Sequence, residues 1–248
     1  MAKVLIITGA SRGIGAATAH LAAERGYAVC VNYRHHQAAA RQVVDAIKQT
    51  GGHAIAVTAD IASEPDVMHL FETVDKHLGT VTALVNNAGI LEQQIRVEAM
   101  DAARLNRIFA TNITGSFLCA KEAVKRMSTQ RGGVGGSIVN VSSRASRLGS
   151  PGEYVDYAAS KGAIDTMTIG LAKEVAAEGI RVNAVRPGFI YTDIHASGGE
   201  PDRVERVKEF VPMKRGGHAI EVANAILWLL SDEASYTTGS FIDITGGK

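Results

Sequence analysis

The sequence has almost no net charge and no long hydrophobic run. Its 248 residues include 26 Lys and Arg against 25 Asp and Glu, which gives a formal net charge of +1. A near-neutral chain offers no bulk electrostatic attraction to nucleic acid or to an anionic membrane. No segment approaches 18 uninterrupted apolar residues, so we expect no transmembrane helix. We therefore expect neither a nucleic-acid partner nor a membrane.

Cysteine and proline are also scarce, with two and five residues. Cys30 and Cys119 lie in the apolar contexts AVCV and FLCA, which predict two buried free thiols. Their spacing fits neither a disulfide framework nor a metal site, so we expect no metal and a cytoplasmic location. So few prolines are not typical of a chain rich in linkers. Glycine, by contrast, is abundant at 26 residues.

Seven short apolar segments recur without alternation, as in strands that are buried on both faces of a parallel sheet. They span 4–8, 28–32, 54–58, 83–86, 137–141, 181–185 and 241–244. Between them the sequence predicts helices over 14–25, 38–49, 64–78, 103–127, 157–178 and 221–230. This alternation predicts an α/β fold with a single doubly wound, Rossmann-type parallel sheet and helices on both faces. Without a break in composition, we expect one domain over 1–248.

One connection, over residues 188–219, is longer than connections within a compact domain usually are. Glycines at 198–199 and 216–217 bracket a short amphipathic helix within it. We expect a lid at about 190–217 that is hinged at these glycines, the alternative being a surface loop that does not move. The apolar side of the expected helix carries Val204, Val207, Phe210 and Val211.

A glycine-rich turn, TGASRGIG at 8–15, follows the first predicted strand and opens the first predicted helix. Glycines let backbone N–H groups approach a phosphate, and a helix N-terminus adds partial positive charge. The turn therefore predicts the phosphate site of a dinucleotide cofactor. The residues that we assign to it are Gly9, Ser11, Arg12, Gly13, Ile14 and Gly15.

The end of the second predicted strand indicates which dinucleotide is bound. Folds that prefer NAD place an acidic residue there, near the ribose 2′-hydroxyl. This strand instead ends in Asn32-Tyr33-Arg34-His35-His36. Arg12 and Arg34 would bring two guanidinium groups to that position, and arginine binds phosphate with a planar fork, which favours NADP. The alternative is that both arginines are solvated surface residues.

Further polar segments follow the third and fourth predicted strands. The carboxyl ends of strands bind ligands in doubly wound sheets, although each segment could also form a simple Asx turn. We assign to the cofactor site Asp60, Ile61, Asn87, Ala88 and Gly89.

A tyrosine and a lysine, Tyr157 and Lys161, lie four residues apart on a predicted helix and so share one face. A nearby ammonium favours the phenolate and is expected to lower the tyrosine pKa from about 10. Such a tyrosine can exchange a proton with an alcohol or a carbonyl. The pair also arises by chance in helices; the neighbouring Tyr154 has no lysine partner. The fifth predicted strand ends just before Tyr157 in Ser142-Ser143, and a hydroxyl there could hydrogen-bond a substrate carbonyl.

In this order the motifs resemble the short-chain dehydrogenase/reductase family. The resemblance covers the whole chain, with TGASRGIG at 8–15, NNAG at 86–89, VSS at 141–143, YAASK at 157–161, RPG at 186–188 and TGSFIDITGG at 238–247. It implies the catalytic group Asn112, Ser143, Tyr157 and Lys161, and nicotinamide contacts at Ile190 and Thr192.

The resemblance implies a role for each catalytic residue. Tyr157 is the general acid/base, Lys161 holds the nicotinamide ribose and keeps the tyrosine pKa low, Ser143 positions the carbonyl, and Asn112 holds a water in a proton relay. The separation of Ser143 from Tyr157 is fourteen residues, against thirteen in many members. Either the loop at 148–156 holds one extra residue, which should alter substrate choice, or Ser142 is the serine.

The implied activity is the NADP(H)-dependent interconversion of a secondary alcohol and a ketone. Two substrate classes compete: a 3-oxoacyl thioester on an acyl carrier protein, and a small polyol or sugar, as in glucose-dehydrogenase-like members. Glu174 and Glu178, at the end of the Tyr–Lys helix, are expected to form an acidic entrance rim that disfavours an acidic carrier.

A non-catalytic NADP-binding redox sensor or scaffold is the alternative from another class, although such relatives usually lose the tyrosine or the lysine. The resemblance also implies a homotetramer, with the Tyr–Lys helix and its predecessor pairing across one interface. Trp228 and the final strand would lie at another.

Overall fold

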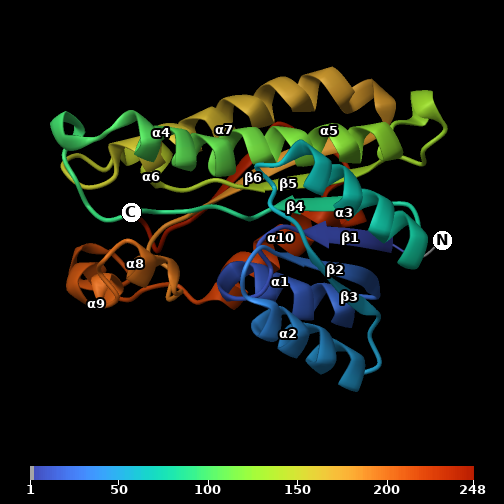
Figure 1. Ribbon diagram of the computed structural model, residues 1–248, viewed down its shortest axis with the longest axis horizontal. Helices are drawn as coiled ribbons and strands as arrows, with labels where there is room; N and C mark the ends of the chain where they lie inside the picture. The colour runs from blue at the N-terminus through green and yellow to red at the C-terminus, as the bar shows by residue number, and fades with distance from the viewer. Residues whose placement is uncertain (1–2) are drawn as a thin grey trace.

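A seven-stranded parallel sheet runs through the computed structural model, which describes residues 3–248 (Figure 1). Its strand order is β3-β2-β1-β4-β5-β6-β7, and every neighbouring pair is parallel. Each strand overlaps one of the seven predicted segments, and β1, β2 and β4 are almost entirely buried, as their uninterrupted apolar sequences predict. The strands are β1 (Lys3–Ile7), β2 (Tyr27–Tyr33), β3 (Ala54–Thr58), β4 (Ala83–Asn86), β5 (Gly136–Val141), β6 (Ile180–Pro187) and β7 (Phe241–Ile244).

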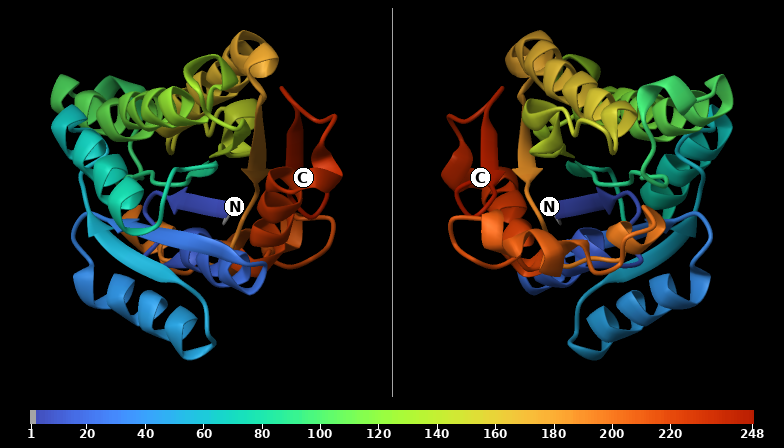
Figure 2. Two further views of the ribbon diagram at one scale, coloured as in Figure 1. Left: turned by 90° about the vertical axis from the view of Figure 1, so that its right-hand side faces the viewer. Right: turned by 90° about the vertical axis from the view of Figure 1, so that its left-hand side faces the viewer.

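Helices cover both faces of the sheet, with α1, α2 and α10 on one side and α3, α4, α5 and α7 on the other (Figures 1 and 2). A separate hydrophobic core lies under each layer of helices. The helices are α1 (Gly13–Glu24), α2 (Gln37–Gln49), α3 (Glu64–His77), α4 (Ala102–Phe109), α5 (Gly115–Met127), α6 (Ala145–Leu148), α7 (Val155–Val175), α8 (Ile194–Ser197), α9 (Arg203–Val207) and α10 (Ala219–Leu230). The doubly wound α/β fold predicted from the sequence is confirmed.

Local chemistry accounts for where helices begin and end. Ser63 caps α3, and its hydroxyl oxygen accepts a hydrogen bond from the Asp66 backbone N–H at 3.4 Å. Gly179 has a φ of +75° where the segment after α7 turns into β6, a conformation that favours glycine. Cys30 and Cys119 are buried free thiols, as their apolar surroundings predict. Among residues 3–248, no helix is long and apolar enough to cross a membrane.

The structure differs from the single helix predicted over 103–127. This stretch forms α4 and α5, with the π-helical turn η2 (Ala110–Thr114) between them. A π turn inserts one residue into the helical repeat, and Asn112 lies in this turn with 1% of its surface exposed. Hydrophobic periodicity alone does not reveal this interruption.

The strand order places the functional residues. The chain runs outward from β1 to β2 and β3, then crosses to the other side of β1 to form β4. Loops leaving adjacent strands diverge at this switch point and leave a crevice at the carboxyl ends of the strands.

Candidate active site

A pocket of about 420 Å³ occupies this crevice. It is lined from the turn after β1, past the ends of β4 and β5, to the segment after β6. Of the residues assigned from the sequence, it brings together Gly9, Ser11, Arg12, Gly13, Ile14, Arg34, Asp60, Ile61, Asn87, Ala88, Gly89, Ser143, Tyr157, Lys161, Ile190 and Thr192. Gly15 and Asn112 lie behind its wall.

The glycine turn has the geometry of a phosphate site. Gly9 and Gly13 have φ values of +62° and +57°, which residues with a side chain rarely adopt. Helix α1 begins after Arg12 with no side-chain cap and no acidic residue in its first turn. Its N-terminal N–H groups therefore lie at the pocket wall with partial positive charge, which fits the phosphates of a dinucleotide.

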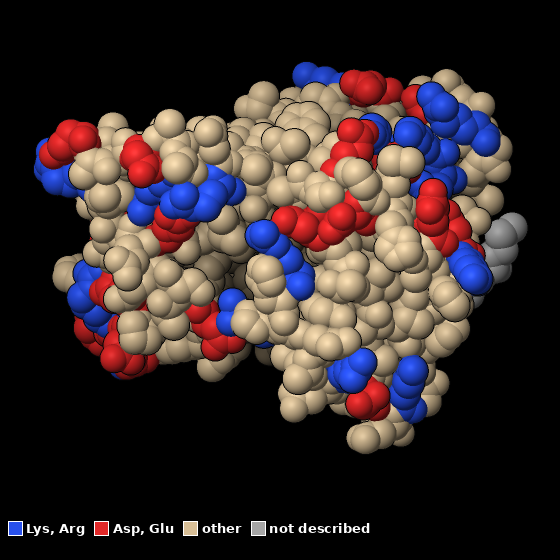
Figure 3. Space-filling view, in the orientation of Figure 1, with Lys and Arg blue, Asp and Glu red and all other residues tan. Residues whose placement is uncertain are grey.

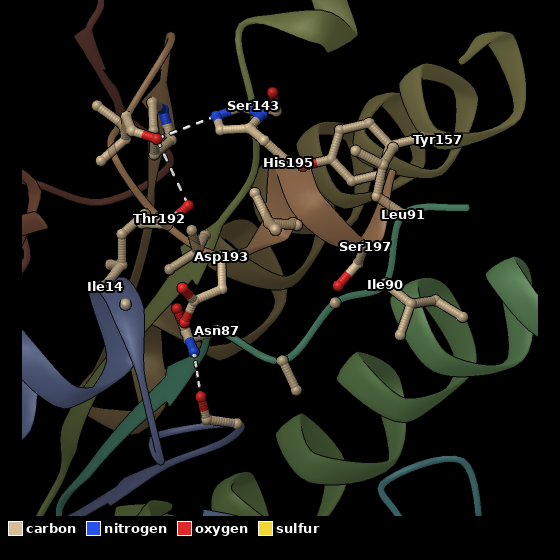
Figure 4. A pocket seen from close by; sticks show the side chains of 18 of the residues that line it. Ile14, Asn87, Ile90, Leu91, Ser143, Tyr157, Thr192, Asp193, His195 and Ser197 are labelled. Carbon is tan, nitrogen blue, oxygen red and sulfur yellow. Dashed lines mark hydrogen bonds between the residues drawn. The ribbon is translucent and has the colours of Figure 1, made fainter. Parts of the chain in front are cut away.

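Gly15 has a packing role instead of lining the pocket. A Cβ atom there would lie 2.6 Å from Asn87 Nδ2 and 2.8 Å from the Ala10 Cα. Asn87 Nδ2 donates to the Thr8 and Gly9 carbonyl oxygens at 2.8 and 3.1 Å, and a dashed line in Figure 4 marks one hydrogen bond from this amide. Because Gly15 has no side chain, it leaves room for the Asn87 amide, which joins the turn after β1 to the segment after β4.

The two arginines predicted to select NADP both line the pocket. Their side chains are about half exposed, with Arg34 Nε 3.1 Å from Asp60 Oδ2 and Arg12 Nε 4.0 Å from Asp193 Oδ2. One guanidinium nitrogen of Arg34 faces a carboxylate, and the remaining N–H groups can serve a phosphate.

Ser143, Tyr157 and Lys161 converge at the other end of the pocket, where Figure 4 shows Ser143 and Tyr157. The Ser143 hydroxyl lies close enough to the Tyr157 phenol to lower its pKa. Lys161 Nζ donates to the Val141 carbonyl oxygen at 2.8 Å and lies 5.6 Å from the centroid of the Tyr157 ring. Successive turns of α7 and the end of β5 thus bring together a phenol, an amine and a hydroxyl.

The pKa of Tyr157 is shifted opposite to the direction predicted from Lys161. Burial raises it to about 12 and outweighs the influence of the nearby Ser143 hydroxyl, which lowers it. Burial also lowers the pKa of Lys161 to about 8, although the charge of Asp165 raises it. The lysine therefore carries less charge than an exposed ammonium, and its Nζ points to a carbonyl oxygen.

Ser142 and Ser143 have separate environments. Ser142 is buried, and its hydroxyl hydrogen-bonds Asp165 Oδ1 at 2.7 Å and the Lys161 carbonyl oxygen at 3.2 Å. Ser143 is only partly buried and lies beside Tyr157. The geometry therefore favours Ser143 over Ser142.

Asn112 supports the site from behind. Its Oδ1 accepts from the Ile90 N–H at 2.8 Å, and its Nδ2 donates to the Ile90 carbonyl oxygen at 3.0 Å and to Ser160 Oγ at 3.1 Å. These bonds join the π turn, the segment after β4 and helix α7. A Cβ atom on Gly89 would lie 3.4 Å from Lys161 Nζ and 3.5 Å from Asn112 Oδ1, so this glycine leaves the lysine room.

The pocket entrance is formed by the loop before α7 and by the segment predicted as a lid. The buried Tyr154 donates its hydroxyl to the Gly198 carbonyl oxygen at 3.1 Å. The buried guanidinium of Arg203 pairs with Glu153 and Glu200 and lies over the Tyr154 ring. The loop before α7 thus contacts the segment predicted as a lid directly.

Two sequence-based expectations for this region are wrong. Phe210 is 72% exposed, whereas the three valines grouped with it are buried. Glu174 lies about 25 Å along α7 from Tyr157, so it forms no entrance rim. The hinge role of the glycines stays a prediction; Gly217 forms a bridge with Ile190, and a Cβ on Gly216 would collide with Val204.

The sequence predicts that the loops at 144–156 and 188–215 form walls of the pocket, and these loops contain Tyr154, His195 and Arg203. No motif singles out these three residues, so sequence reasoning assigned none of them individually.

Comparisons with known proteins agree with this geometry. The family model described as enoyl-(acyl carrier protein) reductase matches residues 9–248. An uncharacterized oxidoreductase of Escherichia coli (strain K12), YgfF, is 63% identical over 245 residues, covering 99% of each chain. A human 3-oxoacyl-[acyl-carrier-protein] reductase is 41% identical and is covered over 98% of its length, against 100% of this chain.

Glucose 1-dehydrogenase 2 of Bacillus subtilis is 37% identical, with 99% of this chain and 94% of the relative covered. Among solved structures, a short-chain type dehydrogenase/reductase from Mycobacterium marinum superposes with a TM-score of 0.92 at 35% identity, covering 99% of this chain and 94% of that chain. Motifs, fold and relatives agree: the chain belongs to the short-chain dehydrogenase/reductase family and is an oxidoreductase that depends on a nicotinamide coenzyme.

Proposed function

We propose that the protein interconverts a secondary alcohol and a ketone with NADP(H), and that Tyr157 is its general acid/base. The observation that carries this proposal is that one pocket contains both sites: an uncapped helix N-terminus lies at one end of it, and Ser143, Tyr157 and Lys161 lie at the other. The two ends provide what a dinucleotide-dependent reaction needs: an anion site for phosphates and a proton donor for the reacting oxygen.

The pocket residues fit the coenzyme along its length. The turn with Gly9 and Gly13 would hold the phosphates, and Asn87–Gly89 would line the middle. Ile190 and Thr192 would hold the nicotinamide end, with Lys161 at the ribose. When bound, the coenzyme supplies or accepts the hydride.

The chain's own residues handle the proton. With its pKa raised, Tyr157 is a neutral phenol near pH 7 and can donate its proton to the carbonyl oxygen during reduction. The Ser143 hydroxyl lies beside the phenol and can hold the carbonyl oxygen. Lys161, with a pKa of about 8, holds an exchangeable proton near the phenol.

NADP is favoured over NAD because of charge at the end of β2. Arg12 and Arg34 both line the pocket there, and no acidic residue ends the strand. Asp60, the nearest carboxylate, already faces Arg34. A 2′-phosphate would therefore meet guanidinium groups.

The segment 190–217 is proposed as a lid over the substrate end of the pocket. Its helices α8 and α9 cover this end, and the contacts of Tyr154 and Arg203 hold them to the loop before α7. A homotetramer is also proposed, because half-exposed apolar side chains on α5 and α7 offer a surface for a second copy.

The proposed role of Tyr157 is tested by comparing Tyr157→Phe with Tyr154→Phe. Tyr157→Phe is expected to lower kcat for ketone reduction by about 10²- to 10⁴-fold, because it removes the proton donor, and to retain NADPH binding. Tyr154→Phe removes a phenolic hydroxyl three residues earlier in the chain, and its kcat is expected to fall far less. Wild-type NADPH binding without turnover across ketones, sugars and acyl thioesters would instead support a redox sensor or scaffold.

A further inference from the structure

His195 is a buried residue of α8 that lines the pocket, and the reaction proposed above gives it no role. Only 9% of its surface is exposed. Figure 4 shows it in the same part of the pocket as Ser143 and Tyr157. Its Nδ1 atom is buried and has no hydrogen-bond partner among the described residues 3–248.

The hydrogen bond of the other ring nitrogen determines which protons the ring carries. His195 Nε2 lies 3.0 Å from the Ile190 carbonyl oxygen. A carbonyl oxygen can only accept, so Nε2 carries the hydrogen and donates it. In the neutral ring, Nδ1 then has a lone pair and is an acceptor.

The surroundings keep this ring neutral. Burial lowers the pKa of His195 by more than the hydrogen bond to Ile190 raises it, and the charge of Arg203 lowers it against a smaller opposing effect of Glu200. The Nδ1 atom is therefore an acceptor without a partner among residues 3–248, on a side chain that lines the pocket. A simple ketone offers no hydrogen-bond donor to it.

We propose that His195 Nδ1 accepts a hydrogen bond from a hydroxyl group of the substrate, so that the substrate is a hydroxyketone or the corresponding diol. Cationic side chains near this part of the pocket disfavour an ammonium donor. Arg203 and Lys248 both lie against Phe189, at 5.7 and 5.8 Å from its ring centroid. This inference rests on the proposed alcohol–ketone chemistry and adds a specificity-determining residue to it.

Two substitutions separate the two ring nitrogens. The amide of Asn at position 195 lies near the former Nδ1 and can supply an acceptor there. Gln reaches the former Nε2 position and can keep the bond to the Ile190 carbonyl oxygen, but it leaves no acceptor at Nδ1. His195→Asn therefore tests recognition of the hydroxyl group, and His195→Gln tests structural support for the lid.

The readout is the ratio of kcat/KM within each variant for two matched pairs of ketones. The pairs are 3-hydroxybutan-2-one against butan-2-one, and 2-hydroxycyclohexanone against cyclohexanone. Because the ratio is taken on one preparation, partial unfolding of a variant cancels. The wild type is expected to prefer the hydroxyketones at least tenfold, since a site built to bind a hydroxyl discriminates against analogues without it. The preference should persist in His195→Asn and fall to about twofold or less in His195→Gln.

The possible results distinguish this inference from the proposed function. If the wild type reduces both members of each pair equally, the inference is wrong and the alcohol–ketone function stands. If the preference survives in His195→Gln and is lost in His195→Asn, His195 only supports the lid and the inference is also wrong. If none of the four ketones is reduced with either NADPH or NADH, the proposed function fails together with the inference.

A second measurement does not depend on turnover. In ¹⁵N NMR spectra of the NADP-loaded protein, His195→Asn identifies the ring signals of His195. Addition of 3-hydroxybutan-2-one is expected to shift the unprotonated Nδ1 resonance, whereas butan-2-one is expected to leave it in place. An equal response to both ketones would contradict a hydrogen bond from the hydroxyl.

Discussion

Tyr157 shows how burial decides the direction of a pKa shift when a cation lies nearby. The i, i+4 spacing correctly predicted that Lys161 shares its face, with Nζ 5.6 Å from the ring centroid. The amine is itself desolvated and donates to the Val141 carbonyl oxygen, so it does little to stabilise a phenolate. Removal of the phenol from water instead raises its pKa to about 12.

This shift predicts opposite pH requirements for the two reaction directions. Reduction needs the neutral phenol, which predominates throughout the neutral range. Alcohol oxidation needs the phenolate, whose fraction grows about tenfold per pH unit below the pKa. We therefore expect kcat/KM for alcohol oxidation to rise steadily from pH 7 to pH 9. A plateau that begins below pH 8 would instead mean a lowered tyrosine pKa.

Arg34 provides a residue-level test of coenzyme choice. Arg34→Gln keeps a polar side chain and removes the charge that would meet a 2′-phosphate. Loss of one charge-assisted contact is expected to lower kcat/KM for NADPH by about 10- to 100-fold. The kcat/KM for NADH is expected to stay within about threefold of the wild-type value. Arg41→Gln on α2, which does not line the pocket, is the matched control. An equal loss for both coenzymes would contradict the assignment.

At the scale of elements, short segments far apart in sequence complete the pocket. The π turn carries Asn112 behind the site, where its amide joins Ile90 and Ser160. Helices α8 and α9 are too short to be stable alone, so tertiary contacts must hold them in place. The buried guanidinium of Arg203 is prominent among these contacts.

Arg203 and Arg206 offer a matched pair of substitutions in the proposed lid. Both pair with Glu153 and Glu200, but the side chain of Arg203 is 9% exposed and that of Arg206 is 53% exposed. A buried pair loses more when one partner is removed than an exposed pair does. Arg203→Leu is therefore expected to speed proteolysis within 194–215 and to lower kcat/KM, each by about tenfold or more. Equal, small effects of Arg203→Leu and Arg206→Leu would show that these ion pairs do not hold the segment.

At the scale of the whole molecule, the outer surface of the helical layer suggests how copies assemble. Phe117 on α5 and Ile169 on α7 are 51% and 42% exposed. Apolar groups of this size on neighbouring helices are typical of an interface between subunits. The resemblance to the family implied pairing through these same helices.

Light scattering after size-exclusion chromatography tests this arrangement. The wild type is expected to have four times the mass of the 26.1 kDa chain. Phe117→Glu combined with Ile169→Glu places charges in the interface and is expected to reduce the mass to two chains or one. Val97→Glu, at a position that is 57% exposed and outside both helices, is the control and should leave the mass unchanged. A monomeric wild type would contradict the proposed homotetramer.

The sequence by itself determined the doubly wound sheet, the glycine turn and the residues that meet at the reacting end of the pocket. These features depend on local patterns: apolar strand segments, a turn between strand and helix, and the spacing of Tyr157 and Lys161. Only the tertiary structure decided the pKa of Tyr157, the separate environments of Ser142 and Ser143, the π turn at Asn112, and the contacts of Arg203 and His195. Each of these depends on burial and on contacts between residues far apart in the chain, which sequence spacing does not specify.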